Sequence, residues 1–224
     1  MSEQKVLKIA DLFDLEHTIA APLFEGKEYP WEVLDGIKEF ILQLGPKLDP
    51  EKFDNPSEGV WIAKDAKVFP SAYLGSPCII DSGAEVRHCA FIRGSAIVGK
   101  NAVVGNSVEL KNVVLFDNVQ TPHYNYVGDS VLGYKAHMGA GSITSNVKSD
   151  KTLVVIKARD EQIETGRKKV GAMLGDCVEV GCNSVLNPGT VIGRHSNVYP
   201  TSSVRGVVPA NSIYKGSGNI VTKC

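Results

Sequence analysis

A large apolar residue recurs at every sixth position through the middle of this 224-residue chain. The ten successive positions are Ile62, Val68, Leu74, Ile80, Val86, Ile92, Val98, Val104, Leu110 and Phe116. Four residues after each of them, nine of the ten positions carry a small or short-branched residue. The pattern resumes near the C-terminus at Leu174, Val180, Leu186, Ile192, Val198 and Val204. Neither the period of a helix nor that of a plain strand requires this spacing.

A period of six predicts a β-helix of hexapeptide repeats, in which three short strands form a triangular coil of about eighteen residues. The large residue points into the prism and the small one fits the corner. Gly75, Gly99 and Gly105 follow large residues, and we expect them to supply unusual backbone dihedrals. Chance periodicity is the alternative, and two phases locked together argue against it. We therefore expect an all-β chain, a left-handed parallel β-helix with a small helical N-terminal segment.

Residues 1–57 lack the six-residue pattern and are predicted to form a helical N-terminal cap. The stretch WEVLDGIKEFILQLG has apolar residues at helical spacing and ends at Gly45-Pro46, a stop signal. A shorter helix is expected in VLKIADLFDL. The segment either covers the open first coil, whose strand edges would otherwise be unpaired, or forms an arm that faces substrate or braces a trimer.

The β-helix domain is expected over residues 58–210, with an insertion at about 147–172. Within the insertion, LVVIKA and QIETG are two extended runs joined by Arg159-Asp160-Glu161, which predicts a hairpin or loop that projects from the prism. Residues 211–224 are expected to form a final turn and a short C-terminal tail.

The composition narrows the choice of partners and compartment. The net charge is −1, so nothing in the totals favours nucleic acid or an anionic membrane. Five cysteines without a CxxC pair favour reduced thiols over a disulfide framework or a zinc site. The sequence has no signal-peptide pattern and no run of about 18 apolar residues. We expect a cytoplasmic protein and, because the flat faces of such prisms commonly associate, a homotrimer with parallel axes.

Two cations fall one coil apart within the regular pattern. Arg93 and Lys111 are eighteen residues apart, each directly after a large apolar residue, so they are predicted to stack on adjacent coils. Two stacked cations repel, and an anion such as a phosphate between them would relieve the repulsion. The alternative is a solvated basic pair with acidic neighbours.

The stretch TPHYNYVGDSVLGYKAHMGAGSIT, residues 121–144, interrupts the pattern at Pro122 and holds further candidate chemistry. His123 is a candidate general base, and a carboxylate such as Glu109 would orient its ring and make it more basic. The slip in the pattern means that spacing alone does not establish their contact. Gly139-Ala140-Gly141 offers unobstructed backbone N–H groups, which suit an oxyanion in acyl transfer but also an ordinary turn.

The segment VGNSVELKNVVLFDNVQTPHYNYVGDSVLGYKAHMGAGSITSN resembles the acetyltransferase half of the bacterial bifunctional enzyme that N-acetylates glucosamine 1-phosphate and then uridylylates the product. It is closer to the C-terminal β-helix of related sugar-phosphate nucleotidyltransferases, whose insertion has a GRRKLG-like end; here this end is GRKKVGAMLGD. The resemblance spans roughly residues 61–208. It implies an acetyl-CoA-dependent N-acetyltransferase acting on glucosamine or galactosamine 1-phosphate, with no metal required and no pyrophosphorylase activity, because residues 1–57 are too short for a nucleotidyltransferase domain.

The resemblance also implies roles for individual residues. The family positions fall on Arg93 and Lys111 for the phosphate, His123 for the catalytic base, Glu109 for its orienting carboxylate, Tyr126 and Asn146 for the sugar, Ala140 for the N–H at the acetyl group, Lys169 or Lys168 for a substrate lysine, and Cys182 and Pro200 for coenzyme A. Two positions depart from the family. His137 replaces an asparagine that contacts substrate, and Cys182 replaces a serine near coenzyme A, which leaves the sugar and the acyl donor open.

Two other functions remain as alternatives. A β-helix that binds sugar phosphate without turnover would keep the pocket and release no coenzyme A. A metal-dependent β-helix enzyme of the trimeric carbonic-anhydrase type needs closely paired histidines, and the five here show no such pair. We therefore predict no metal site.

Overall fold

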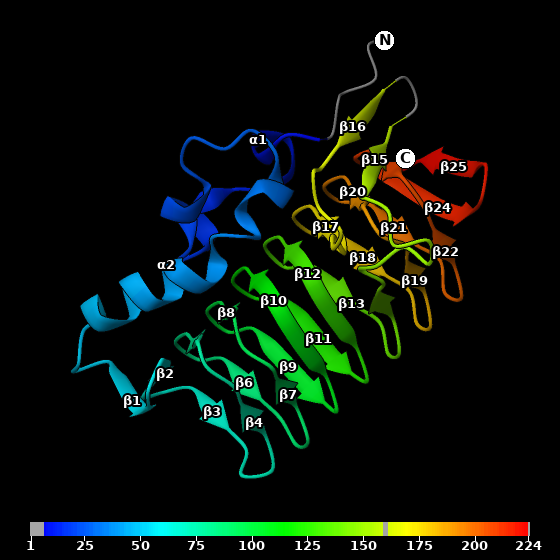
Figure 1. The fold of residues 1–224 in the computed structure, drawn as a ribbon. Coiled ribbons are helices and arrows are strands. Elements are labelled where there is room, and N and C mark those ends of the chain that lie inside the picture. The colour runs from blue at the N-terminus through cyan, green and yellow to red at the C-terminus, as the bar shows by residue number, and fades with distance from the viewer. Residues whose placement is uncertain (1–6, 159–160, 224) are drawn as a thin grey trace.

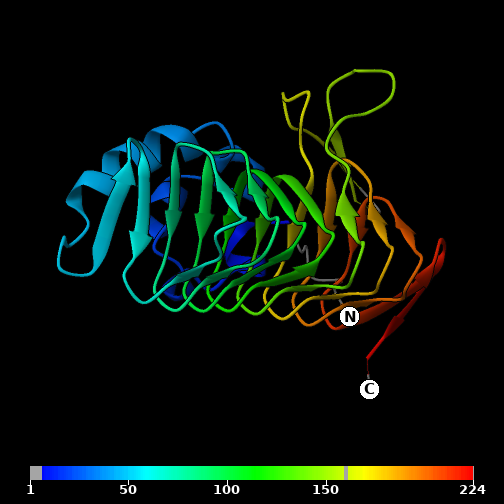
Figure 2. The same ribbon diagram turned by 90° about the horizontal axis from the view of Figure 1, so that it is seen from below.

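The computed structural model describes residues 7–158 and 161–223, and most of them form the expected left-handed parallel β-helix (Figures 1 and 2). Face one carries β4 (Tyr73–Leu74), β7 (Phe91–Ile92), the first half of β10 (Glu109–Leu115), the first half of β12 (Tyr126–Leu132), β14 (Ile143–Thr144), β19 (Val185–Leu186) and β22 (Ser203–Val204). Face two carries β2 (Val60–Ala63), β5 (Cys78–Ile80), β8 (Ala96–Val98), the second halves of β10 and β12, β17 (Ala172–Leu174), β20 (Thr190–Ile192) and β23 (Val207–Val208). Face three carries β3 (Lys67–Val68), β6 (Glu85–Val86), β9 (Val103–Asn106), β11 (Gln120–His123), β13 (His137–Met138), β18 (Glu179–Val180), β21 (Asn197–Val198) and β24 (Ser212–Gly216).

The repeat shortens by one residue at Lys111-Asn112, which is earlier than the slip expected at Pro122. Leu110 pairs with Ile92, eighteen residues before it. Leu115 pairs with Val98, only seventeen residues before it. The chain therefore turns the corner between faces one and two one residue early, so the interior series continues from Leu110 to Leu115.

Phe116 was predicted to be an interior repeat residue, and this prediction is wrong. The early corner places its side chain outside the prism, where it is fully buried by the N-terminal segment. Its ring lies 5.1 Å from that of Phe13 and 5.7 Å from that of Phe24, centroid to centroid. Phe116 therefore anchors the N-terminal segment instead of filling the prism.

Glycine after the interior residue allows close stacking of coils, which corrects the expectation of unusual dihedrals. A Cβ on Gly105 would lie 1.6 Å from the carbonyl oxygen of Pro122 on the next coil, and one on Gly75 would lie 2.8 Å from that of Arg93. Positive φ occurs elsewhere, at glycines such as Gly83 (67°) and Gly94 (114°) and at residues other than glycine: Ser95 (51°), Asn101 (55°), Ser107 (54°), Asn112 (55°), Asn118 (60°) and Tyr124 (52°).

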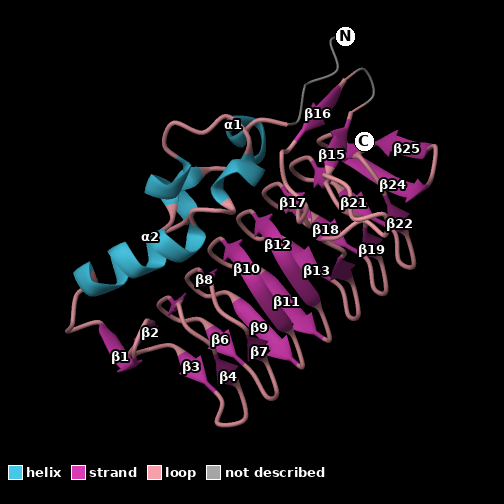
Figure 3. Ribbon diagram, viewed as in Figure 1, coloured by secondary structure: helices cyan, strands magenta, loops and turns pink. Residues whose placement is uncertain are grey.

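The helical N-terminal segment lies along face two and does not cover the open first coil, so that expectation is corrected (Figure 3). It consists of α1 (Ile9–Leu12), η1 (Leu15–His17), η2 (Ala21–Phe24), η3 (Pro30–Val33), α2 (Ile37–Leu44) and η4 (Gly45–Lys47). The outward residues of face two beneath it are apolar and fully buried: Ile79, Ile97, Val114 and Val131. Burial of this apolar stripe explains the placement. The first coil is covered by β1 (Phe53–Ser57), which pairs antiparallel with β2.

The insertion and the C-terminus each form a hairpin. Strands β15 (Val155–Lys157) and β16 (Gln162–Glu164) pair antiparallel, as expected for the two extended runs. Of the predicted connection, Arg159 and Asp160 lie outside the described residues. At the C-terminus, β24 pairs antiparallel with β25 (Asn219–Thr222) and ends the prism, whereas a simple tail was expected. In the described part of the chain, no helix has the length and apolar character that a bilayer span needs.

Candidate functional site

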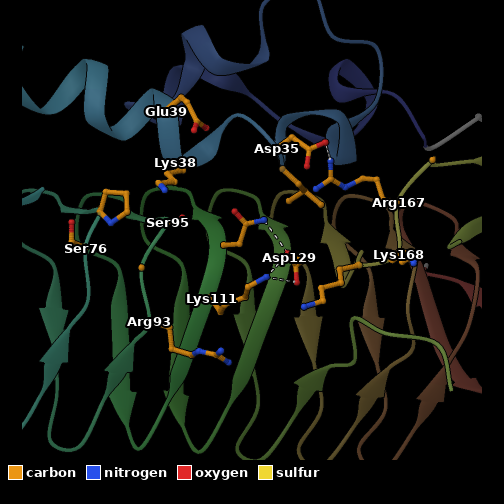
Figure 4. A pocket seen from close by; sticks show the side chains of 16 residues that line it. Asp35, Lys38, Glu39, Ser76, Arg93, Ser95, Lys111, Asp129, Arg167 and Lys168 are labelled. Carbon is orange, nitrogen blue, oxygen red and sulfur yellow. Dashed lines mark hydrogen bonds and ion pairs between the residues drawn. The ribbon is translucent and has the colours of Figure 1, made fainter. Parts of the chain in front are cut away.

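Arg93 and Lys111 lie on face one at equivalent positions of adjacent coils. The Arg93 N–H donates to the carbonyl oxygen of Leu110 at 2.8 Å, one residue before Lys111. The predicted stacking of the two residues is thereby confirmed. Figure 4 shows both side chains below α2, at the corner between faces one and two.

Each of these cations is already paired with a carboxylate. The Arg93 guanidinium lies 2.9 Å from Glu109, and the Lys111 ammonium lies 2.9 Å from Asp129. The hydrogen bond and the charge of Glu109 raise the pKa of Arg93. The pair therefore has the acidic neighbours of the alternative interpretation, and an incoming anion would compete with those carboxylates.

Asp129 is the centre of a buried polar network that sequence reasoning missed. Its side chain accepts hydrogen bonds from Lys111 Nζ at 2.9 and 3.1 Å, from Asn112 Nδ2 at 2.9 Å and from Asn146 Nδ2 at 2.6 Å. Only 2% of the residue is exposed. The eighteen-residue spacing that located Arg93 above Lys111 does not find Asp129, because the next coil has seventeen residues and Lys111 pairs with Gly128.

Tyr126 and Asn146, the predicted sugar-binding residues, are joined to this network. The Asn146 amide donates to the Tyr126 hydroxyl at 3.2 Å. Burial, and next the charge of Asp129, raise the pKa of Tyr126. Gly128 leaves room for the pair, since a Cβ there would lie 2.5 Å from the Tyr126 oxygen. The two polar side chains are thus held in place before any ligand binds.

His123 ends β11 at the corner between faces three and one, and its side chain is exposed. Within residues 7–158 and 161–223, its ring makes no hydrogen bond or ion pair, and the carboxylate expected to orient it, Glu109, is bonded to Arg93. The predicted contact between Glu109 and His123 is therefore not formed. The physical reason is register: Glu109 lies beside Phe91 on face one, and the Arg93 guanidinium is within reach.

The predicted oxyanion and coenzyme A residues form a column along the same corner. The Gly141 N–H donates to the His123 carbonyl at 2.9 Å, so the Gly139–Gly141 turn stacks directly on the histidine. The Ala140 carbonyl accepts the Asn183 N–H at 2.8 Å, next to Cys182. The Ala140 N–H itself has no partner within the described ranges.

Cys182 and Pro200 continue this column. The Cys182 carbonyl accepts the Thr201 N–H at 2.8 Å, and a Cβ on Gly181 would lie 2.4 Å from Pro200 N. Cys182 is exposed. The residues that the resemblance assigns to coenzyme A thus follow the His123 corner toward the C-terminal coils.

The ring of His137, unlike that of His123, is hydrogen-bonded to a carboxylate in the described part of the chain. Its Nδ1 lies 2.8 Å from Glu179, in the neighbouring strand of face three. The pair is partly exposed and lies on the face that adjoins the His123 corner. Among the described residues, no cluster of three or more His, Cys, Asp or Glu has the geometry of a metal site.

A cavity of about 790 Å³ opens where the N-terminal segment and the end of the insertion meet the corner between faces one and two. Lys168 and Lys169 line it together with Arg93 and Lys111. Lys169 also pairs with Val147 in an isolated bridge beside Asn146. Both candidate substrate lysines therefore line the same cavity as the predicted phosphate ligands, and the choice between them stays open.

The fold and the arrangement of these residues define a hexapeptide-repeat β-helix with a polar site across one face and corner. The GMPPB C-terminal domain family matches residues 74–213, and the chain belongs to this family. Similar curated proteins include the bifunctional sugar-1-phosphate nucleotidylyltransferase/acetyltransferase of Sulfurisphaera tokodaii, 29% identical over 96% of this chain and 56% of that protein. The bifunctional protein GlmU of Methanococcus maripaludis is 32% identical over 87% of this chain and 48% of that protein. The resemblance predicted from the sequence is confirmed, and the chain spans about half the length of these relatives.

Solved structures with a likeness to this chain include the polysialic-acid-specific acetyltransferase NeuO, with 12% identity, a TM-score of 0.47, and coverage of 70% of this chain and 80% of that chain. The acetyltransferase domain of PglB from Neisseria gonorrhoeae has 17% identity, a TM-score of 0.33, and coverage of 80% of this chain and 63% of that chain. Both likenesses are too distant to assign residues.

Proposed function

We propose that this chain is an acetyl-CoA-dependent N-acetyltransferase that acts on an amino-sugar 1-phosphate, glucosamine or galactosamine 1-phosphate, in the supply of nucleotide-sugar precursors. The names of the similar proteins support a sugar-related acetyltransferase. The observation that carries the proposal is the continuity of the site. Cationic and sugar-binding groups lie across face one, and this face ends at the corner where the His123 carbonyl bonds the Gly139–Gly141 turn.

In this proposal the phosphate binds Arg93 and Lys111. Since Arg93 is paired with Glu109, the phosphate replaces a carboxylate as the partner of Arg93. The released Glu109 side chain can then turn toward His123 and orient its ring. Tyr126 and Asn146 would fix the sugar.

His123 then takes a proton from the amine as the amine nitrogen attacks the thioester carbon of acetyl-CoA. The Ala140 N–H stabilises the oxyanion, the C–S bond breaks, and coenzyme A leaves as the thiol after taking the proton that His123 removed from the amine. Coenzyme A would lie along the column from Ala140 to Cys182 and Pro200. Every role in this scheme belongs to a side chain, a backbone group or the co-substrate, and the scheme requires no metal.

Release of thiol from acetyl-CoA in the presence of glucosamine or galactosamine 1-phosphate tests the proposal. We expect turnover with at least one of the two sugars and a loss of about a hundredfold or more in His123→Ala. Full activity in His123→Ala would refute the mechanism. His195→Ala, at a corner outside the site, is the matched control.

We also propose a homotrimer with parallel axes, working in the cytoplasm. Tyr73 and Phe91 support an interface on the prism, since they are 61% and 42% exposed and their rings lie 5.5 Å apart. Sedimentation equilibrium should give three times the chain mass of 24.1 kDa. A monomer at micromolar concentration would contradict the trimer.

A second candidate is a β-helix that binds sugar phosphate without turnover. Two observations favour it: the His123 ring has no partner among residues 7–158 and 161–223, and Glu109 is already bound to Arg93. Saturable binding of glucosamine 1-phosphate, measured by calorimetry together with an absence of thiol release, would support this function instead.

A further inference from the structure

The cavity beneath α2 carries more positive charge than one phosphate needs. Six cationic side chains line it: Lys38, Arg93, Lys111, Arg167, Lys168 and Lys169. Three carboxylates accompany them, those of Asp35, Glu39 and Asp129. The lining therefore holds an excess of three positive charges in a protein whose net charge is −1.

Three of the six cations that line the cavity have a carboxylate partner. Arg93, Lys111 and Arg167 are paired with Glu109, Asp129 and Asp35 respectively. By contrast, the ammonium groups of Lys38, Lys168 and Lys169 have no side-chain or carbonyl partner in the described part of the chain. The end of the insertion thus supplies three cations to the lining, whereas the N-terminal segment supplies Lys38 together with the carboxylates of Asp35 and Glu39.

These unpaired lysines stand at different places along the cavity. In Figure 4 the Lys168 side chain extends toward Lys111 and Asp129. Lys38 descends from α2 near the turn that holds Ser95, toward the first coils. A phosphate bound between Arg93 and Lys111 would be close to Lys168 and would leave Lys38 unmatched. A ligand that pairs with Lys38 as well as with Arg93, Lys111 and Lys168 needs a second anionic group farther along the cavity.

We propose that the part of this cavity beside Lys38 is a second anion subsite, with Lys38 as its principal residue. This subsite would bind the distal phosphate of an amino sugar linked to a nucleoside diphosphate. The inference rests on the proposed function, because it assigns the sugar-proximal phosphate to Arg93 and Lys111. It extends the substrate class from amino-sugar 1-phosphates to amino sugars activated by a nucleoside diphosphate.

Isothermal titration calorimetry without acetyl-CoA tests the subsite, with UDP-glucosamine, GDP-glucosamine and glucosamine 1-phosphate as ligands. We expect the wild-type chain to bind one of the diphosphate-linked sugars about tenfold more tightly than the 1-phosphate. Lys38→Ala should reduce this preference to about one. Lys47→Ala changes another exposed lysine of the N-terminal segment that does not line the cavity, and it should keep the wild-type preference. The preference should also weaken as salt rises.

The outcomes separate this inference from the proposed function. Equal or weaker binding of both diphosphate-linked sugars, or an unchanged preference in Lys38→Ala, overturns the second subsite and leaves acetyl transfer standing. A preference that depends on Lys38, together with no thiol release from any of the three sugars, supports the subsite and overturns the transfer reaction alone.

Discussion

At the scale of single residues, Asp129 is the acceptor that holds the polar side chains of the candidate site together. It occupies a corner at a φ of 48°, in the left-handed region that asparagine and aspartate tolerate better than most residues. From that corner its buried carboxylate accepts hydrogen bonds from the side chains of Lys111, Asn112 and Asn146. One acidic side chain thus connects a predicted phosphate ligand with a predicted sugar ligand. A buried network of this kind is stable only when every member is satisfied.

We predict that Asp129→Ala destabilises the chain by about 3 kcal/mol, because it leaves the Lys111 charge and the two amides without their acceptor. Urea unfolding followed by circular dichroism measures the loss. Asp129→Asn keeps the shape and the corner conformation and should lose less, so the difference between the two variants isolates the missing side chain. A free energy of unfolding for Asp129→Ala within 0.5 kcal/mol of wild type would contradict the network's role.

At the scale of elements, the spacing between coils depends on glycines that follow interior residues. Gly105→Ala would put a Cβ 1.6 Å from the Pro122 carbonyl oxygen, so we predict a loss of about 3 kcal/mol as the two coils are forced apart. Gly26→Ala is the control, with a φ of 72° and no atom within 4 Å of the added Cβ, and it should cost about 1 kcal/mol for its backbone alone. Thermal unfolding of both variants measures the difference. Equal losses would show that close stacking is not the cause.

The packing of the N-terminal segment gives a second prediction at this scale. Phe116→Ala removes the ring that holds Phe13 and Phe24, and we expect a loss of about 3–4 kcal/mol from the cavity it leaves. Hydrogen exchange should show faster exchange in residues 7–48 than in the coils. Ile220→Ala, at an exposed side chain of β25, should change neither measurement. Uniform protection across both parts of the Phe116→Ala variant would contradict the anchoring role.

The regular repeat made most of the prism predictable, and the irregular corner made the rest unpredictable. Positions up to Leu110 follow directly from the period, because one deviation would move a polar residue into the interior. The shortening of the repeat by one residue at Lys111-Asn112 cannot be detected in this way. An apolar residue, Phe116, occupies by coincidence the position at which the next interior residue was expected. The site shows the same division. Spacing located Arg93 above Lys111, but the partner of Glu109 depends on side-chain reach, which spacing does not encode.

At the scale of the whole molecule, the three faces of the prism have different surroundings. Face two has apolar residues on both sides of its strands and is buried under the N-terminal segment and the insertion. Among the described residues, the cavity at the Arg93 and Lys111 edge of face one opens beneath the N-terminal segment, and the His123 side chain is exposed at the opposite corner, so the candidate chemistry lies where ligands have access. The edge of face two that meets the N-terminal segment also holds three carboxylates whose pKa values are raised chiefly by burial, those of Asp81, Asp117 and Asp176.

These carboxylates make the stability of the molecule depend on pH, and Asp81 allows a clean test. Its Oδ1 accepts the Ser82 N–H at 2.7 Å, while its buried Oδ2 has no partner among the described residues. Because its folded pKa is raised, the folded chain binds more protons than the unfolded chain above the reference value of 3.8. Stability contributed at this site therefore falls as pH rises through that window.

We predict that Asp81→Asn, which cannot ionise, is more stable than wild type at pH 7. Its advantage should shrink as the pH is lowered toward 3.8 and below it, because the wild-type carboxyl then becomes protonated in both the folded and the unfolded state. Urea unfolding of both proteins at pH 7, 5.5 and 4 measures the difference, and the comparison cancels the other titrating groups. Asp54→Asn, at an exposed carboxylate of β1, should show no such trend. An advantage of Asp81→Asn that is constant with pH would assign the effect to packing instead of charge, because only an ionising group links the two proteins' stabilities to proton concentration.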